Sequence, residues 1–332
     1  MSTVPISILD LAAVGEGETI ADSFAGSVTL AQRAEALGYH RIWYAEHHNI
    51  RTIASSATAV LIAHIAGNTS RIRLGAGGIM LPNHAPLTIA EQFGTLATLH
   101  PGRIDLALGR APGSDQVTMR ALRRDPMSAE SFPQDVLELQ GFLGDETRIP
   151  NVHAIPGRGT YVPLYILGSS LFGAQLAAAL GLPYAFASHF APQALFPAIQ
   201  VYREQFRPSA QCEQPYVIVG ANVITAGTDE EAQEQLHITR RARARHLFTT
   251  RGGDRITDAE AEAILRSPQA AYVDQMLMYT AVGTPGAVRA FLDDFQRQTE
   301  ASEIIVVHQA DSIARRLRSV ELLADGMELT PD

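Results

Sequence analysis

Two adjacent histidines in the segment Glu46-His47-His48-Asn49 could take part in acid–base chemistry. An imidazole exchanges a proton near neutral pH, so either side chain could act as a proton donor or acceptor. Adjacent residues that leave a strand point in opposite directions, so we expect at most one of the two histidines to face a shared site. The alternative is a histidine that only hydrogen-bonds to a neighbouring loop.

A metal site is a second kind of chemistry, because His47, His48, His84 and His189 could in principle surround one ion. Barrels that bind metals usually carry their ligands at alternating positions of one strand. The first predicted strand offers only Asp10 near its end. We therefore expect no metal site.

Anion binding is a third possibility, at Gly168, Ser169 and Ser170, which directly precede a predicted helix. Backbone N–H groups and hydroxyls at a helix N-terminus can face a phosphate. Arg110, at the end of a different predicted strand, is a candidate charge partner for the anion. The alternative for the two serines is that one of them only caps the helix. The segment does not complete the nucleophile motif G-x-S-x-G, and the glycines of 75–78 do not complete a dinucleotide-binding motif.

The elements that would position these residues alternate between strands and helices along the chain. In the segment 71–114, an apolar, glycine-rich strand precedes a helix that begins near Pro86, and a Pro101-Gly102 turn leads into the next strand. Two strands joined by a helical crossover run parallel. Eight such strands are predicted, which favours a (β/α)8 TIM barrel over the alternative of an open doubly wound sheet.

In such a barrel the active site forms at the C-terminal ends of the strands. The polar and glycine residues that follow the predicted strands are therefore expected to gather at one end of the barrel. These residues are Glu46, His47, His48, Gly77, Gly78, Asn83, His84, Gly109, Arg110, Ser169, Ser170, Ser188, His189 and Asn222.

The region 233–279 is longer than one crossover helix requires, and we interpret it as a helical insertion after the seventh strand. Long helices are predicted at 229–248 and 258–279. The arginines of this region are expected to form a solvated helix face; they are Arg240, Arg241, Arg243 and Arg245. No linker rich in proline, glycine or serine divides the chain, so we predict one domain over residues 1–332.

Composition argues against several classes of protein. The formal net charge of −9 argues against a nucleic-acid-binding protein, whose surface would be basic. No apolar run is long enough to span a membrane, and the N-terminus lacks the pattern of a signal peptide. The single cysteine, Cys212, cannot form an intrachain disulfide, which indicates a reducing compartment. We therefore expect a cytoplasmic protein.

Several motifs occur in an order that resembles the bacterial luciferase-like flavin-dependent monooxygenases, the LLM class. These motifs are Glu46-His47-His48, the run 75–82 followed by Pro86, Pro101-Gly102-Arg103 with Gly109-Arg110, and Gly181-Leu182-Pro183. The chain is most similar to an uncharacterised branch with the signatures AEHHN, LPNHAPL and LGRAPGSD. The resemblance extends over most of the chain and weakens between residues 230 and 279.

The resemblance implies a barrel that binds reduced FMN, or in some relatives coenzyme F420, at the C-terminal ends of its strands. By similarity, His47 is the histidine that luciferases need for their oxygen chemistry. Gly77 and Gly78 match a pair linked by a non-proline cis peptide bond beneath the flavin. The residues expected to wall the pocket are Met80, Leu81 and the loop from Ala111.

For the flavin phosphate, the resemblance implies binding by Arg110 and by the loop 168–170. The sequence departs from the luciferases at three nearby positions. Gly109 stands where they have a cysteine, Ser169 where they have a glutamate, and Gly173 where they have a threonine. Phosphate binding should therefore depend more on backbone N–H groups and on the arginine, and light emission is not expected.

The implied activity is that of a two-component monooxygenase. A separate NAD(P)H:flavin reductase would supply reduced FMN, which reacts with O2 to give a C4a-hydroperoxide that oxygenates a small organic substrate. A homodimer is implied through the helices 56–68 and 88–100. Three alternatives stay open: an F420-dependent dehydrogenase on the same barrel, a flavin-binding protein without turnover, and a metal-dependent hydrolase.

Overall fold

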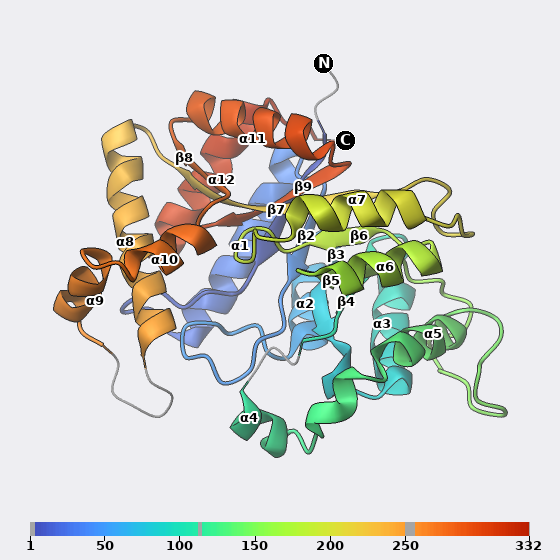
Figure 1. Cartoon of the computed structure of the whole chain (residues 1–332). Helices are drawn as coiled ribbons and strands as arrows, with labels where there is room; N and C mark the ends of the chain where they lie inside the picture. Colours follow the sequence, from blue (N-terminus) through green and yellow to red (C-terminus); the bar gives the residue numbers. More distant parts are fainter. Residues whose placement is uncertain (1–3, 112–114, 250–255, 332) are drawn as a thin grey trace.

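Eight parallel strands close into a barrel in the computed structural model, which describes residues 4–111, 115–249 and 256–331 (Figure 1). The barrel strands are β1 (Ile6–Asp10), β2 (Arg41–Tyr44), β3 (Arg73–Met80), β4 (Ile104–Gly109), β5 (Leu164–Gly168), β6 (Tyr184–Phe186), β7 (Val217–Thr225) and β9 (Glu303–His308). Consecutive barrel strands pair in parallel, and the pairings β6–β7, β7–β9 and β9–β1 close the ring. The predicted (β/α)8 TIM barrel is confirmed.

A further strand, β8 (Thr280–Gly283), lies outside the ring, and the sequence patterns do not indicate it. The long strand β7 pairs with β6 through its first residues and with β8 through its last ones, where Asn222 lies opposite Thr280. The predicted helix 258–279 is wrong. It is divided into α9 (Asp258–Leu265) and α10 (Ala270–Met276), because Pro268 has no N–H to continue a helix.

The crossover helices end where the sequence places helix-ending residues. Gly38 and Gly181 adopt left-handed conformations directly after α1 and α6, with φ of 86° and 64°. No helix within the described ranges is both long and apolar enough to cross a membrane. The remaining helices are α1 (Ile20–Leu37), α2 (Thr58–Ala66), α3 (Pro86–Leu99), α4 (Gln116–Ala121), α5 (Phe132–Leu143), α6 (Leu171–Leu180), α7 (Leu195–Gln205), α8 (Asp229–Phe248), α11 (Pro285–Thr299) and α12 (Ile313–Met327), with 3-10 turns at Leu81–Asn83 and Pro126–Ala129.

Two apolar layers hold the barrel together. The larger layer lies between strands and helices, where Leu106 of β4 and Phe93 of α3 are fully buried in the same cluster. Side chains at alternate strand positions point to opposite faces, so the intervening residues fill the inside of the barrel. Trp43, Tyr165 and Ile218 belong to this inner cluster.

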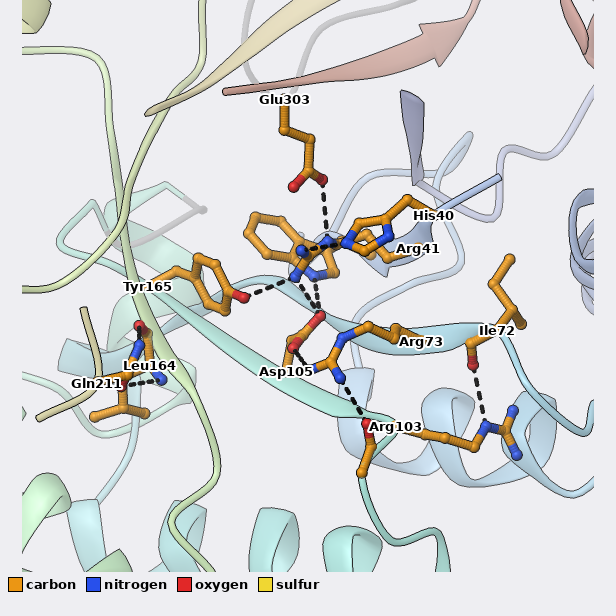
Figure 2. Close-up of polar contacts among 12 residues, drawn as sticks. His40, Arg41, Ile72, Arg73, Arg103, Asp105, Leu164, Tyr165, Gln211 and Glu303 are labelled. Carbon is orange, nitrogen blue, oxygen red and sulfur yellow. Dashed lines mark hydrogen bonds and ion pairs between the residues drawn. The ribbon is translucent and has the colours of Figure 1, made fainter. Parts of the chain in front are cut away.

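A buried charge network occupies the end of the barrel where the strands begin (Figure 2). Arg41, the first residue of β2, forms ion pairs with Asp105 at 2.7 Å and with Glu303 at 3.0 Å, and it donates a hydrogen bond to the Tyr165 hydroxyl at 2.7 Å. Arg73 forms a second ion pair with Asp105. Because each buried charge here has a partner, this N-terminal end is held together by paired ions, and the loops available for a ligand lie at the other end.

Candidate functional site

A buried carboxylate organises the loops that follow β2 and β3. Glu46 is 1% exposed and accepts a hydrogen bond from the Met80 backbone N–H at 2.9 Å. Its carboxylate also contacts the Asn83 side-chain amide at 3.1 Å, His84 at 3.0 Å and His48 at 2.9 Å. Burial alone would raise the pKa of Glu46, but the hydrogen bonds from these side chains together lower it to about 2. Glu46 therefore fixes the end of β3 as an ionised group.

That at most one of the two adjacent histidines faces a shared site stays a prediction. His48 contacts Glu46, whereas His47 lies close enough to His189, in the loop after β6, to affect its protonation. Burial is the main reason that the pKa of His189 falls to about 3, and the positive charges of Arg243 and of protonated His47 lower it further. His189 is therefore neutral at pH 7.

The loop that carries His189 is fastened to β7. The Asn222 side chain donates to the His189 carbonyl at 2.7 Å and accepts from Gln309 at 2.7 Å, and the Ser188 hydroxyl donates to the Gly220 carbonyl at 2.6 Å. A Cβ on Gly220 would lie 2.4 Å from Nδ1 of His189, so only glycine leaves room for the imidazole. The position of this ring is thus fixed by neighbouring strands.

The peptide bond between Gly77 and Gly78 is cis, as the resemblance implied. Neither residue has space for a side chain: a Cβ on Gly77 would lie 2.7 Å from Cβ of Trp43, and one on Gly78 would lie 2.6 Å from the Ala107 carbonyl oxygen. The pairing of β3 with β4 shifts register at this point. The place of the two glycines beneath a flavin stays a prediction.

Glycine at position 109 has a visible packing consequence. Gly109 pairs with Met80 across β4 and β3, and a Cβ there would lie 2.6 Å from the Met80 methyl carbon. The Met80 thioether therefore occupies space that a cysteine would need. Of the residues expected to wall the pocket, Met80 and Leu81 are buried, whereas the loop after Ala111 includes 112–114, which lie outside the described residues.

Arg110 lies beside the first turn of α6. Its guanidinium carbon is 4.1 Å from the centre of the Phe172 ring, and Phe172 is the second residue of that helix. Ser170 is the residue before the helix, and its side chain makes no capping hydrogen bond. The alternative, that one serine only caps the helix through its side chain, is therefore wrong for Ser170. Arg110 thus lies beside the start of the helix that follows the loop 168–170.

The expected solvated arginine face of α8 is only partly correct. Three arginines form ion pairs with acidic residues of α9 and α10, namely Arg240 with Asp274, Arg241 with Asp258 and Glu262, and Arg245 with Asp258. Arg243 is half-buried, and its positive charge helps to lower the pKa of His189. This difference between Arg243 and the other three arginines was not visible in the sequence.

The four histidines considered as metal ligands have different neighbours. His48 and His84 contact Glu46, and the charge of His47 acts on the pKa of His189. Within residues 4–111, 115–249 and 256–331, no group of three or more histidine, cysteine, aspartate or glutamate side chains is arranged to hold an ion.

Residues 4–300 match the family model described as luciferase-like monooxygenase. The chain belongs to this family. It is 48% identical to the luciferase-like monooxygenase of Escherichia coli strain K12, with 98% of each chain covered, and 51% identical to the uncharacterized protein YvbT of Bacillus subtilis, with 96% of each covered. The crystal structure of apo-MsnO8 is similar at 37% identity, with a TM-score of 0.87 over 99% of this chain and 100% of that one.

More distant structures of this luciferase-like fold bind different cofactors. A type II Baeyer–Villiger monooxygenase in complex with FMN is 15% identical, with a TM-score of 0.72 over 98% of both chains. An F420-dependent secondary alcohol dehydrogenase in complex with an F420-acetone adduct is 16% identical, with a TM-score of 0.68 over 99% and 98% of the two chains. At these identities the likeness shows the fold alone.

Proposed function

We propose that this protein is an FMN-dependent monooxygenase that takes reduced flavin from a separate NAD(P)H:flavin reductase and oxygenates a small organic substrate with O2. The observation that carries the proposal is the arrangement at the C-terminal ends of the strands. Arg110 and the first turn of α6 lie at the same end of the barrel as the cis Gly77–Gly78 bond and His47.

The fit to a phosphate comes from α6. Ser170 leaves the first N–H groups of the helix without a side-chain cap, and such groups are the ones that bind anions at helix N-termini. The positive end of the helix dipole and the Arg110 guanidinium add favourable charge at the same place. FMN carries such a phosphate, which supports flavin mononucleotide as the cofactor.

The fit to a flat ring system comes from β3 and β4. Gly77, Gly78 and Gly109 keep side chains away from the ends of these two strands, and the Met80 thioether supplies an apolar surface there. A reduced flavin bound at this place would supply the reaction with O2. His47 would donate or accept a proton at the substrate, and Glu46 would hold the loop that positions the ring.

Anaerobic titration of the protein with reduced FMN and with reduced F420 tests the proposed cofactor. We expect the protein to bind reduced FMN more tightly and to consume oxygen only with FMN. Tighter binding of F420, without oxygen uptake, would instead support a dehydrogenase on the same barrel. Binding of reduced FMN without any oxygenated product, for every substrate tested, would support a flavin-binding protein without turnover.

The proposed role of His47 has its own test. In the His47→Ala variant we expect a larger share of the consumed oxygen to appear as hydrogen peroxide rather than in the product, with reduced FMN still bound. An unchanged ratio of hydrogen peroxide to oxygen consumed would remove His47 from the reaction.

A homodimer through α2 and α3 is part of the same proposal. Both helices expose large apolar side chains in the monomer: Val60 is 72% exposed and Leu99 is 65% exposed. Exposed apolar groups on neighbouring helices are common in subunit interfaces. Light scattering after size-exclusion chromatography would show twice the mass of one chain, and a monomer at micromolar concentration would contradict this interface.

A further inference from the structure

The inner face of β7 carries polar groups toward the C-terminal end of the strand. Ile218 belongs to the apolar cluster inside the barrel, and side chains two residues apart on a strand point to the same face. Gly220 and Asn222 therefore also face the inside of the barrel, beyond Ile218. Asn222 is fully buried, and its side-chain amide donates a hydrogen bond to the His189 carbonyl at 2.7 Å.

The imidazole of His189 lies against this face of β7. His189 follows β6, which pairs with β7, and its Nδ1 would lie 2.4 Å from a Cβ on Gly220. Cγ and Cε1 of the ring would lie 3.3 and 3.4 Å from the same Cβ, so Nε2 is on the side of the ring away from β7. His189 is only half-buried, so part of the ring is accessible. Nε2 is thus the nitrogen that a bound molecule could reach.

Gln309 adds a second half-buried polar side chain beside Asn222. It directly follows β9, which also pairs with β7, and its side-chain amide donates to the Asn222 side-chain oxygen at 2.7 Å. Its backbone N–H donates to the Val223 carbonyl, which holds the residue beside the end of β7. His189, Asn222 and Gln309 are therefore joined into one polar wall.

The polar wall lies across the barrel from β3 and β4. In the closed ring β1–β2–β3–β4–β5–β6–β7–β9, β7 is four strands from β3, and β9 is four strands from β4. Gly77 of β3 faces inward, because a Cβ there would lie 2.7 Å from Trp43 and 2.8 Å from Leu9, both in the inner cluster. A flat ring placed on Gly77, as proposed above, would therefore have the polar wall on the opposite side of the barrel.

We propose that His189 determines substrate specificity, by donating a hydrogen bond from Nε2 to an acceptor oxygen of the organic substrate. This inference rests on the proposed function, because it places the substrate between the flavin and the polar wall. A site that offers a fixed hydrogen-bonding group binds an analogue without the matching group less well, since that group is then left unpaired.

The protonation state of His189 agrees with a donor at Nε2. The imidazole is neutral at pH 7, because burial lowers its pKa, and a neutral imidazole has one N–H and one unprotonated nitrogen. Nδ1 is buried and has no hydrogen-bond partner among the described residues. Unpaired buried N–H groups are rarer in proteins than unpaired acceptors, so we place the proton on Nε2.

Binding of ketones and of hydrocarbons of the same shape to the FMN-loaded protein tests the proposal. The pairs are cyclohexanone with methylenecyclohexane and acetophenone with α-methylstyrene, which differ in the acceptor oxygen. The ratio of the two dissociation constants is compared between wild type and His189→Leu, because the difference in hydrophobicity of the two probes then cancels. We expect the substitution to change this ratio against the ketone by about tenfold or more for at least one pair, which corresponds to about 1.4 kcal/mol.

His189→Gln should restore part of the ketone preference, because its amide supplies an N–H donor. An unchanged ratio in His189→Leu, or no binding of either ketone to the wild type, would overturn the proposal. Nitrogen NMR of the wild type gives a second measurement that needs no variant of the site to fold. It should show His189 protonated at Nε2, with a shift that moves when the ketone binds, and protonation at Nδ1 would overturn the proposal.

His308→Leu is the matched control. His308 is also a buried histidine whose pKa is lowered to about 3, but its Nδ1 is 2.8 Å from the Ser319 hydroxyl of α12, on the outer side of β9. This variant should keep the wild-type ratio. His189→Leu should bind FMN as the wild type does, and weakened FMN binding would assign His189 to the cofactor and overturn the proposal. If the wild type binds neither FMN nor F420, the proposed function fails, and the ratio can still be measured on the protein alone.

Discussion

Replacing Glu46 by glutamine should separate the structural role of this carboxylate from the chemistry around it. The substitution keeps the shape but removes the charge. It turns one acceptor oxygen into a donor, either at Oε1, which faces His48, His84 and Asn83, or at Oε2, which faces the Met80 N–H and His84. Loss of two charge-assisted hydrogen bonds, at about 1.5 kcal/mol or more each, gives about 3 kcal/mol. The fall of the Glu46 pKa from 4.5 to about 2 corresponds to a similar free energy.

Urea unfolding of the wild type and Glu46→Gln, from pH 7 down to pH 4, measures this contribution. The pKa of Glu46 is lower in the folded than in the unfolded protein. Its contribution is therefore complete above about pH 4.5 and is lost as the pH falls toward 2. We expect the variant to be about 3 kcal/mol less stable at pH 7, and the difference to shrink by about 1 kcal/mol at pH 4. Equal stability at pH 7, or a difference that grows in acid, would refute the reasoning.

Two further predictions concern a buried histidine and a buried network of ion pairs. Burial, with the nearby charge of Arg316, lowers the pKa of His308 to about 3 from 6.5, so the wild type should lose stability as the pH falls below 6.5. Between pH 7.5 and 5.0 the free energy of unfolding of His308→Gln, measured in urea, should fall by about 2 kcal/mol less than that of the wild type. The same dependence on pH in both proteins would contradict this. Arg41→Ala leaves Asp105 and Glu303 buried with fewer partners, so it should lower the free energy of unfolding by about 3–5 kcal/mol. A loss below about 1 kcal/mol would show that the network is not needed for stability.

Local signals in the sequence were sufficient for most of the barrel. The helices at Phe132–Leu143 and Asp229–Phe248 begin and end at the predicted residues. Strand β8 was missed because four residues are too few to show a pattern, and because its partner is the extended end of β7. The long predicted helix before it failed at Pro268, where a rigid ring outweighs the helix-forming residues around it.

The glycine pair and the arginine beside a helix start could be predicted, whereas the contacts of the other charged side chains could not. The cis bond at Gly77–Gly78 and the approach of Arg110 to α6 agree with what the resemblance implied, although the roles of these residues stay predictions. The environments of Glu46 and Arg243 could not be read from the sequence. Each depends on which way a side chain turns once distant strands and helices have packed, and no local pattern fixes that direction.

Comparison of FMN with riboflavin tests the central claim most directly, because the two flavins differ only in the phosphate. The dissociation constants of both reduced flavins would be measured anaerobically for the wild type and for Arg110→Ala. If the phosphate lies between Arg110 and the first turn of α6, the wild type binds FMN more tightly than riboflavin by about tenfold or more, and the substitution removes most of this preference. A preference for FMN that is the same in both proteins would contradict the account.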